Sequence, residues 1–238
     1  MKKVMIVVVL FVSGIVAATA QSKGTFAVGA DLVSDYVWRG MQQGSNEPNF
    51  QPSLTYTNGA LTIGAWGSGN FSGSLKEADL YATYAFSSLF SATVTDYNWI
   101  FTPGKSYLEY GKDKTDHIFE VSLNYAGVSS FPLSVSLNTM VYGADKKATD
   151  ATKQAYSTYY ELGYPLADNA KLFLGGTLNE SANYYTSGFA VTNVGIKVSK
   201  SVVFSDKFSL PVYGVFGVNP AGLADTQPTA FFVVGLTL

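Results

Sequence analysis

The chain has 238 residues, of which 47% are hydrophobic, 15% are aromatic and only 13% are charged, with a formal net charge of −2. A typical soluble domain carries about 25% charged residues. The missing basic excess argues against a nucleic-acid partner, and the absence of cysteine excludes disulfides, thiolate metal sites and a lipid-anchored N-terminal cysteine.

The first 20 residues are typical of an export signal. Lys2 and Lys3 precede the apolar run from Val4 to Val16, and Ala18-Thr19-Ala20 forms a small-x-small cleavage site. The apolar run is shorter than the ~20 residues that a membrane-spanning helix needs. We expect residues 1–20 to be a cleaved signal peptide and residues 21–238 to form one domain.

The stretch from Phe26 to Gln43 alternates with a period of two. Its even positions are largely apolar and end in Tyr36 and Trp38, while the odd positions include Asp31, Asp35 and Arg39, the single arginine of the chain. Successive side chains of a strand point to opposite faces. The pattern predicts one long strand with an apolar face and a polar face.

The same alternation recurs to the end of the chain, which predicts about twelve strands. Asn58-Gly59 is a strong hairpin signal between the second and third of them. Asp96 falls on the apolar parity of its strand, which indicates either that the strand has left the hydrocarbon or that a bulge shifts its register. After the first stretch the expected strands are Asn49–Thr57, Leu61–Ser68, Glu77–Phe86, Phe90–Trp99, Phe119–Tyr125, Leu133–Val141, Tyr156–Tyr164, Leu172–Leu178, Asn193–Val198, Leu210–Phe216 and Phe232–Leu238.

Short connections alternate with longer polar ones, as in bacterial outer-membrane barrels; Ser199 to Lys207 is longer than this rule predicts. Charges gather in the loops, and the non-apolar face is rich in Gly, Ser, Thr and Asn. These features favour an all-β, antiparallel transmembrane β-barrel in the outer membrane over the alternative, a soluble secreted β-sandwich.

The block Ser34-Asp35-Tyr36-Val37-Trp38-Arg39-Gly40-Met41-Gln42-Gln43 resembles S-D-Y-x-[aromatic]-R-G-x-[SQ]-Q, which opens the TorF-type family of porins. The similarity continues through residues 64–68 and 77–81, is fainter at 117–122, and so covers roughly the first half of the expected mature chain. The resemblance implies a barrel porin of uncharacterised substrate.

Parity assigns the polar face of the strands to a wet lumen. One arginine can bind a carboxylate through two donors, so Arg39 is expected either to pin the first strand to acidic neighbours or to act in transport. The predicted lumen acids are Asp31, Asp35, Glu77, Asp79, Glu120 and Glu161, against the bases Arg39, Lys171 and Lys197. The acidic excess predicts a weak cation preference.

Aromatic residues at strand ends on the apolar face predict a girdle at the membrane interface. The girdle candidates are Tyr36, Trp38, Tyr56, Tyr84, Tyr125 and Tyr164.

An enzymatic function is not expected. The single histidine, His117, has Phe119 and not a hydroxyl as its same-face neighbour, so no nucleophile–base pair is evident. No spacing indicates a metal site or a cofactor. The charged loops Gly104–Asp116 and Ala144–Lys153 are expected to be solvated surface.

We expect a passive porin for small polar solutes or ions, which contacts outer-membrane lipid and the outer-membrane assembly machinery. The alternative is a barrel with a plugged lumen whose loops serve binding, adhesion or structure; a lipolytic enzyme is a distant third. Small lumen residues (Gly64, Ser122, Ser134, Ser136, Gly175, Gly195) favour an open pore, and lumen aromatics (Trp66, Tyr81, Tyr159, Phe173, Phe231) favour a narrow one.

Overall fold

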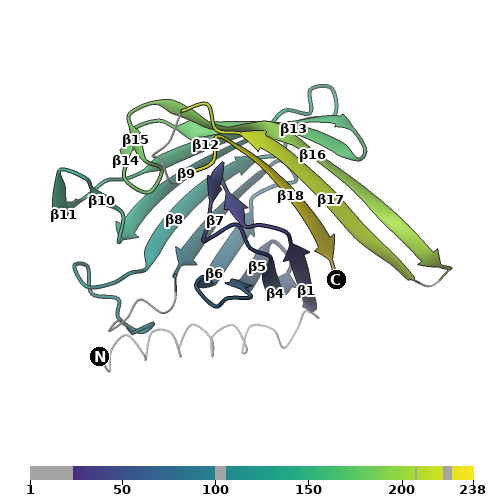
Figure 1. The fold of residues 1–238 in the computed structure, drawn as a ribbon, viewed down its shortest axis with the longest axis horizontal. Coiled ribbons are helices and arrows are strands. Elements are labelled where there is room, and N and C mark those ends of the chain that lie inside the picture. Colours follow the sequence, from purple (N-terminus) through teal and green to yellow (C-terminus); the bar gives the residue numbers. More distant parts are fainter. Residues whose placement is uncertain (1–23, 100–105, 207, 222–226) are drawn as a thin grey trace.

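The computed structural model describes residues 24–99, 106–206, 208–221 and 227–238. It is all-β, and twelve antiparallel strands close into a barrel (Figure 1), as predicted. The predicted signal peptide lies outside the described residues. In barrel order the wall strands are β1 (Thr25–Val33), β18 (Ala230–Thr237), β17 (Phe208–Val218), β16 (Ala190–Ser205), β13 (Ala170–Thr177), β12 (Thr158–Ala167), β9 (Ser134–Gly143), β8 (Ile118–Tyr125), β7 (Phe90–Tyr97), β6 (Lys76–Ala85), β5 (Leu61–Asn70) and β4 (Asn49–Asn58).

The two faces of the wall are inverted relative to a soluble protein. Large apolar side chains such as Val28, Phe90 and Phe232 are exposed on the outside, whereas polar residues such as Glu120 and Asn138 are buried inside. This arrangement is consistent with a barrel placed in an outer membrane. No helix among the described residues is long and apolar enough to cross a membrane.

The expectation of one strand from Phe26 to Gln43 is wrong. β1 ends at Val33, and residues 34–43 form an inner hairpin with the short strands β2 (Val37–Trp38) and β3 (Met41–Gln42). Arg39 and Gly40 make its turn with φ of 54° and 83°. A side chain at position 40 would overlap the carbonyl oxygen of Thr192, so this turn requires glycine.

The Asn58-Gly59 hairpin is confirmed with its turn shifted by one residue. Asn58 pairs with Leu61, so Gly59 and Ala60 are the two loop residues, and Gly59 has a φ of 60°. Glycine in the first loop position with positive φ is typical of a type II′ turn.

The long connection expected from Ser199 to Lys207 is instead mostly strand. β16 continues to Ser205, which pairs with Phe208 of β17. Because β13 last pairs with β16 at Val198, residues 199–205 and the start of β17 extend past the neighbouring wall as a projecting hairpin, whose tip lies at the lower right in Figure 1.

The charged loop after β9 is mostly exposed, as expected for solvated surface, but it is also folded. The loop after β9 contains the hairpin β10 (Lys146–Lys147) and β11 (Asp150–Gln154). Asp145 is fully buried there, where it accepts hydrogen bonds from Ser157 Oγ at 2.5 Å and Asn183 Nδ2 at 2.8 Å. Asn183 belongs to the next long loop, which contains β14 (Glu180–Ser181) and β15 (Thr186–Ser187). Asp145 therefore ties two loops together at the end of the barrel opposite the projecting tip.

Residues 106–116, called the strap below, fold back over the outer face of the wall. Asp96 keeps its outward parity, since β7 pairs with β6 and β8 without a register shift. The Asp96 carboxylate accepts a 3.5 Å hydrogen bond from Tyr110 Oη of the strap and lies 2.6 Å from Nδ1 of His117. Asp96 therefore lies on the apolar face without a bulge, and the strap covers its side chain.

The seam between the first and last strands is short. β1 pairs with β18 from Asp31 to Val33, and Ala30 and Leu238 exchange two further backbone hydrogen bonds. The other edge of β1 pairs with β4 along its whole length. The residues Thr25–Gly29 therefore have a β4 neighbour on one side and lie beyond the end of β18 on the other.

Candidate functional site in the barrel lumen

The inner hairpin places Arg39 in the middle of the lumen. Its guanidinium donates to both carboxylate oxygens of Glu120, at 2.6 and 2.8 Å, and to Tyr184 Oη at 2.5 Å. Glu120 is 1% exposed and also accepts hydrogen bonds from Tyr97 Oη and Ser122 Oγ. A buried carboxylate is stable only when paired and hydrogen-bonded, and Glu120 meets both conditions.

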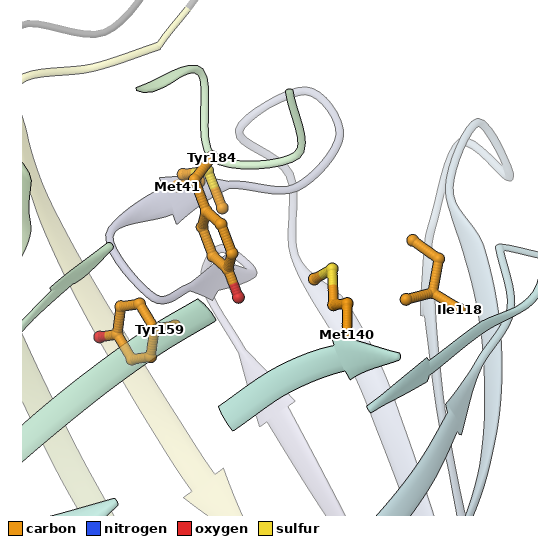
Figure 2. Packing of buried hydrophobic residues seen from close by; sticks show 5 residues of the cluster. All are labelled: Met41, Ile118, Met140, Tyr159 and Tyr184. Carbon is orange, nitrogen blue, oxygen red and sulfur yellow. The ribbon is translucent and has the colours of Figure 1, made fainter. Parts of the chain in front are cut away.

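Aromatic rings enclose this ion pair. The guanidinium carbon lies 4.6 Å from the ring centre of Trp38 and 4.7 Å from that of Tyr159. Tyr184 stacks on both rings, and Figure 2 shows it on its loop above the inner hairpin, with the hydroxyl pointing into the interior. Together with Glu120 and Tyr97 these residues form the Arg39 cluster, which joins the inner hairpin to β7, β8, β12 and the β14–β15 loop.

Hydrogen bonds fix the inner hairpin to β16 and to the connection between β17 and β18. Asn219 Nδ2 donates to the carbonyl of Gly40 at 3.1 Å, and Thr192 Oγ1 donates to the carbonyl of Arg39 at 3.5 Å. Gln227 both accepts from the backbone N–H of Gln42 and donates to its carbonyl. The hairpin is therefore a built part of the lumen.

The remaining predicted lumen acids also lie inside, in different settings. Glu77 and Asp79 are 3% and 5% exposed beside Tyr36, and Asp79 accepts a hydrogen bond from the backbone N–H of Asn98. Asp35 is bound by Gln42 Nε2, and its burial raises the pKa of the carboxyl. Asp31 and Glu161 remain partly exposed, as acceptors for Tyr213 Oη at 3.2 Å and Tyr159 Oη at 3.0 Å.

Two of the six predicted girdle residues are wrongly placed. Tyr36 and Trp38 lie inside the barrel, where Tyr36 packs edge-on against Trp66 and Trp38 belongs to the Arg39 cluster. The reason is that β1 stops at Val33, so strand parity no longer applies to them. Tyr56, Tyr84, Tyr125 and Tyr164 do lie on the outer face near the short turns, each beside a phenylalanine (Phe26, Phe86, Phe90 and Phe131).

The small and the aromatic lumen residues are complementary. A side chain added at Gly64, Gly195 or Gly235 would overlap the ring of Tyr81, Phe173 or Tyr213 on the neighbouring strand. Each of these rings lies over its cross-strand glycine, a pairing known to support curved sheets. The glycines thus make room for rings on the wall and do not by themselves widen the lumen.

Free space in the lumen includes two cavities. The larger, about 630 Å³, lies toward the short turns and is lined by Glu161, Lys171 and several hydroxyl-bearing residues. The smaller, about 210 Å³, lies beside the seam and is lined by Asp35, Lys197, Tyr213 and apolar residues. No residue of the Arg39 cluster lines either cavity.

His117 is on the outer face, with both ring nitrogens occupied. Nδ1 lies 2.6 Å from Asp96 Oδ1, and Nε2 lies 2.7 Å from the carbonyl oxygen of Tyr107. Both partners are acceptors, so the doubly protonated ring satisfies both contacts. This geometry holds the strap and presents no hydroxyl nucleophile to the ring. Among the described residues no cluster of three or more His, Cys, Asp or Glu side chains could hold a metal ion.

Sequence reasoning missed Tyr184, Tyr97, Asn219 and Asp145. Tyr184, Asn219 and Asp145 lie in loops, where no periodicity assigns a face, so the sequence carries no signal for their inward orientation. Tyr97 lies on the inward parity of β7, where Asp96 had made the register uncertain.

The chain matches the model of a family described as a bacterial protein of unknown function (Gcw_chp) over residues 17–170. The chain belongs to this family. The match contains the inner hairpin, Glu120 and Tyr159, hence most of the Arg39 cluster. No curated protein matches the chain significantly.

Proposed function

We propose that this Gcw_chp-family protein is an outer-membrane barrel that forms a narrow, gated pore for small polar solutes or ions. The resemblance to TorF-type porins supports the same assignment. The observation that carries the proposal is a polar lumen that contains a 630 Å³ cavity and, apart from it, an inner hairpin bound to the wall by the Arg39–Glu120 latch.

The latch suits a gate because it joins the inner hairpin to the wall through one ion pair. The hairpin contributes Arg39, whereas Glu120 belongs to the fixed wall strand β8. The accessible lumen charges are nearly balanced, with Asp31 and Glu161 against Lys171 and Lys197, while Glu120 is neutralised by Arg39. Any cation preference is therefore expected to be weak, and reversal potentials in a salt gradient measure it.

The test is single-channel conductance of the refolded protein in planar bilayers. Wild type is expected to give small, infrequent steps, and Arg39→Ala larger or more frequent ones, because the latch is lost. Tyr184→Phe, which removes one hydroxyl from the cluster, is a milder second variant. Lys200→Gln, on the outward face of β16, is the matched control and should behave as wild type.

A second candidate is a closed barrel whose loops bind a partner. The observation that favours it is the enclosure of the Arg39 cluster, where Tyr184 and Met140 are 0% exposed. Silence from both folded wild type and folded Arg39→Ala would contradict the pore and support this alternative.

A further inference from the structure

The larger lumen cavity has a distinctive charge pattern. Among its sixteen lining residues, Glu161 and Lys171 are the two that carry charge. The polar remainder consists of hydroxyls and one amide, Thr83, Ser87, Ser88, Ser91, Asn124, Ser134 and Ser136. A cavity of this kind offers one negative pole, one positive pole and many neutral hydrogen-bonding groups.

The positive pole has no counter-ion from the protein. No carboxylate of the described residues lies within 4.0 Å of Lys171 Nζ, and its side chain folds over Gly163, where an added side chain would overlap it. Lys171 is also the direct register partner of Lys197, but the two side chains turn apart: Lys197 Nζ lies over the ring of Tyr213, 4.0 Å from its centre, and Lys197 lines the smaller cavity.

The negative pole, Glu161, lies on β12, the neighbour of the strand that carries Lys171. Glu161 faces Gly175, whereas Lys171 faces Pro165, so four residues of strand, about 13 Å, separate the two backbones. The lysine side chain reaches back toward Gly163 and shortens this gap. Tyr159 Oη holds one carboxylate oxygen of Glu161, which leaves the other oxygen for a cation.

We propose that this cavity binds small zwitterions of the amino-acid class, with the solute carboxylate at Lys171 and the solute ammonium at Glu161. A charge-assisted hydrogen bond forms at each end. Solutes with only one charge satisfy one pole and leave the other without a partner. The binding is independent of the gate; passage of the bound solute rests on the proposed pore function.

Saturation-transfer NMR on the full protein in detergent tests the binding with L-alanine, L-lactate and ethylamine. L-alanine carries both charges, whereas each of the other two carries one. We expect L-alanine to bind about tenfold more tightly than either single-charge probe, the size of effect that one charged hydrogen bond gives. Equal affinities for L-alanine and L-lactate would overturn the proposal.

Variants locate the site. Lys171→Gln and Glu161→Gln should each weaken L-alanine binding about tenfold. The double variant Lys171→Glu with Glu161→Lys should bind L-alanine more tightly than either single variant, because it again has one positive and one negative pole, with their positions exchanged. Lys200→Gln is again the outward-facing control. Unchanged L-alanine affinity in both single variants, shown by gel shift to be folded, would also overturn the proposal.

Liposome swelling separates this inference from the pore. Swelling in uncharged glycerol measures the pore alone, and the ratio of L-serine to glycerol rates measures the cavity. Absence of swelling in glycerol together with L-alanine binding would refute the pore and retain the site. Swelling in glycerol without preferential L-alanine binding would retain the pore and refute the site.

Discussion

A single arginine organises the lumen, and its geometry explains why lysine would not serve. The planar guanidinium spans both oxygens of Glu120, reaches Tyr184 and lies between two aromatic rings. An ammonium group cannot make the two parallel bonds or stack in this way. Arg39 also has a positive φ of 54°, a conformation that costs a non-glycine residue about 1–3 kcal/mol. The bonds of the cluster offset that strain.

We predict that Arg39→Met and Glu120→Met will each lower the free energy of unfolding by about 3–5 kcal/mol, because each leaves a buried charge without its partner. The double variant Arg39→Met with Glu120→Met should lower the free energy of unfolding less than either single variant, because it leaves no unpaired buried charge. Urea titrations of the barrel in detergent measure all three. The matched control is Lys153→Met, which breaks the exposed Lys153–Asp150 pair and should change little. A double variant as destabilised as the sum of the singles would contradict the coupling.

At the scale of single side chains, the sequence predicted the lumen wherever a strand continues. Glu77, Glu120 and Glu161 lie inside because parity within one strand is strict. The assignment failed for Tyr36 and Trp38 because parity has no meaning once β1 ends at Val33. The link between Arg39 and Glu120 spans 81 positions in the chain and lies beyond any local pattern.

At the scale of elements, periodicity located all twelve wall strands but neither the inner hairpin nor the strap. The strand signals are strong because each wall strand alternates apolar outward-facing residues with lumen-facing ones. Short strands such as β2 and β3 contain too few residues for an alternation to be recognised. The strap packs on the outside through His117, Tyr107 and Tyr110, contacts that depend on tertiary structure.

The strap should be less stable at high pH. Burial lowers the pKa of His117, but the bonds to Asp96 and to the Tyr107 carbonyl, with the nearby charge of Asp116, outweigh burial and raise it above its usual value. Because the pKa of His117 is higher in the folded protein than in the unfolded chain, protonated His117 stabilises the strap fully below about pH 6.5, the pKa of histidine in an unfolded chain. The stabilisation is then lost as the pH rises through the folded value.

Hydrogen exchange of residues 106–116, corrected for intrinsic rates, measures this effect. Protection is expected to fall above neutral pH in wild type. The matched variant His117→Gln should be less protected at acidic pH and should show little further change. The Tyr110 hydroxyl does not account for a loss near neutrality, since burial raises the pKa of Tyr110 to about 12. Identical profiles for the two proteins would contradict the role of His117.

At the scale of the whole molecule, closure is the weakest part of the barrel. The seam between β1 and β18 runs from Ala30 to Val33 and continues in a backbone hydrogen bond from Ser34 to Val234, and the projecting hairpin extends beyond the neighbouring strand ends. The sequence predicted an even number of strands but not how their ends align. Alignment depends on register between distant segments, and the period of two alone fixes register only to within an even number of residues.

A cross-link at the seam tests the closure directly, because the chain has no cysteine of its own. Leu32 pairs with Leu236, so Leu32→Cys with Leu236→Cys should oxidise readily and raise the free energy of unfolding by about 2–4 kcal/mol. Gel mobility and urea titration measure the two effects. The control is Leu32→Cys with Val212→Cys, which places the two cysteines on β1 and β17. β18 separates these strands, because Leu236 of β18 pairs with Leu32 on one edge and with Val212 on the other. Efficient oxidation of this control pair in the folded protein would mean that β1 meets β17, and the twelve-strand closure would be wrong.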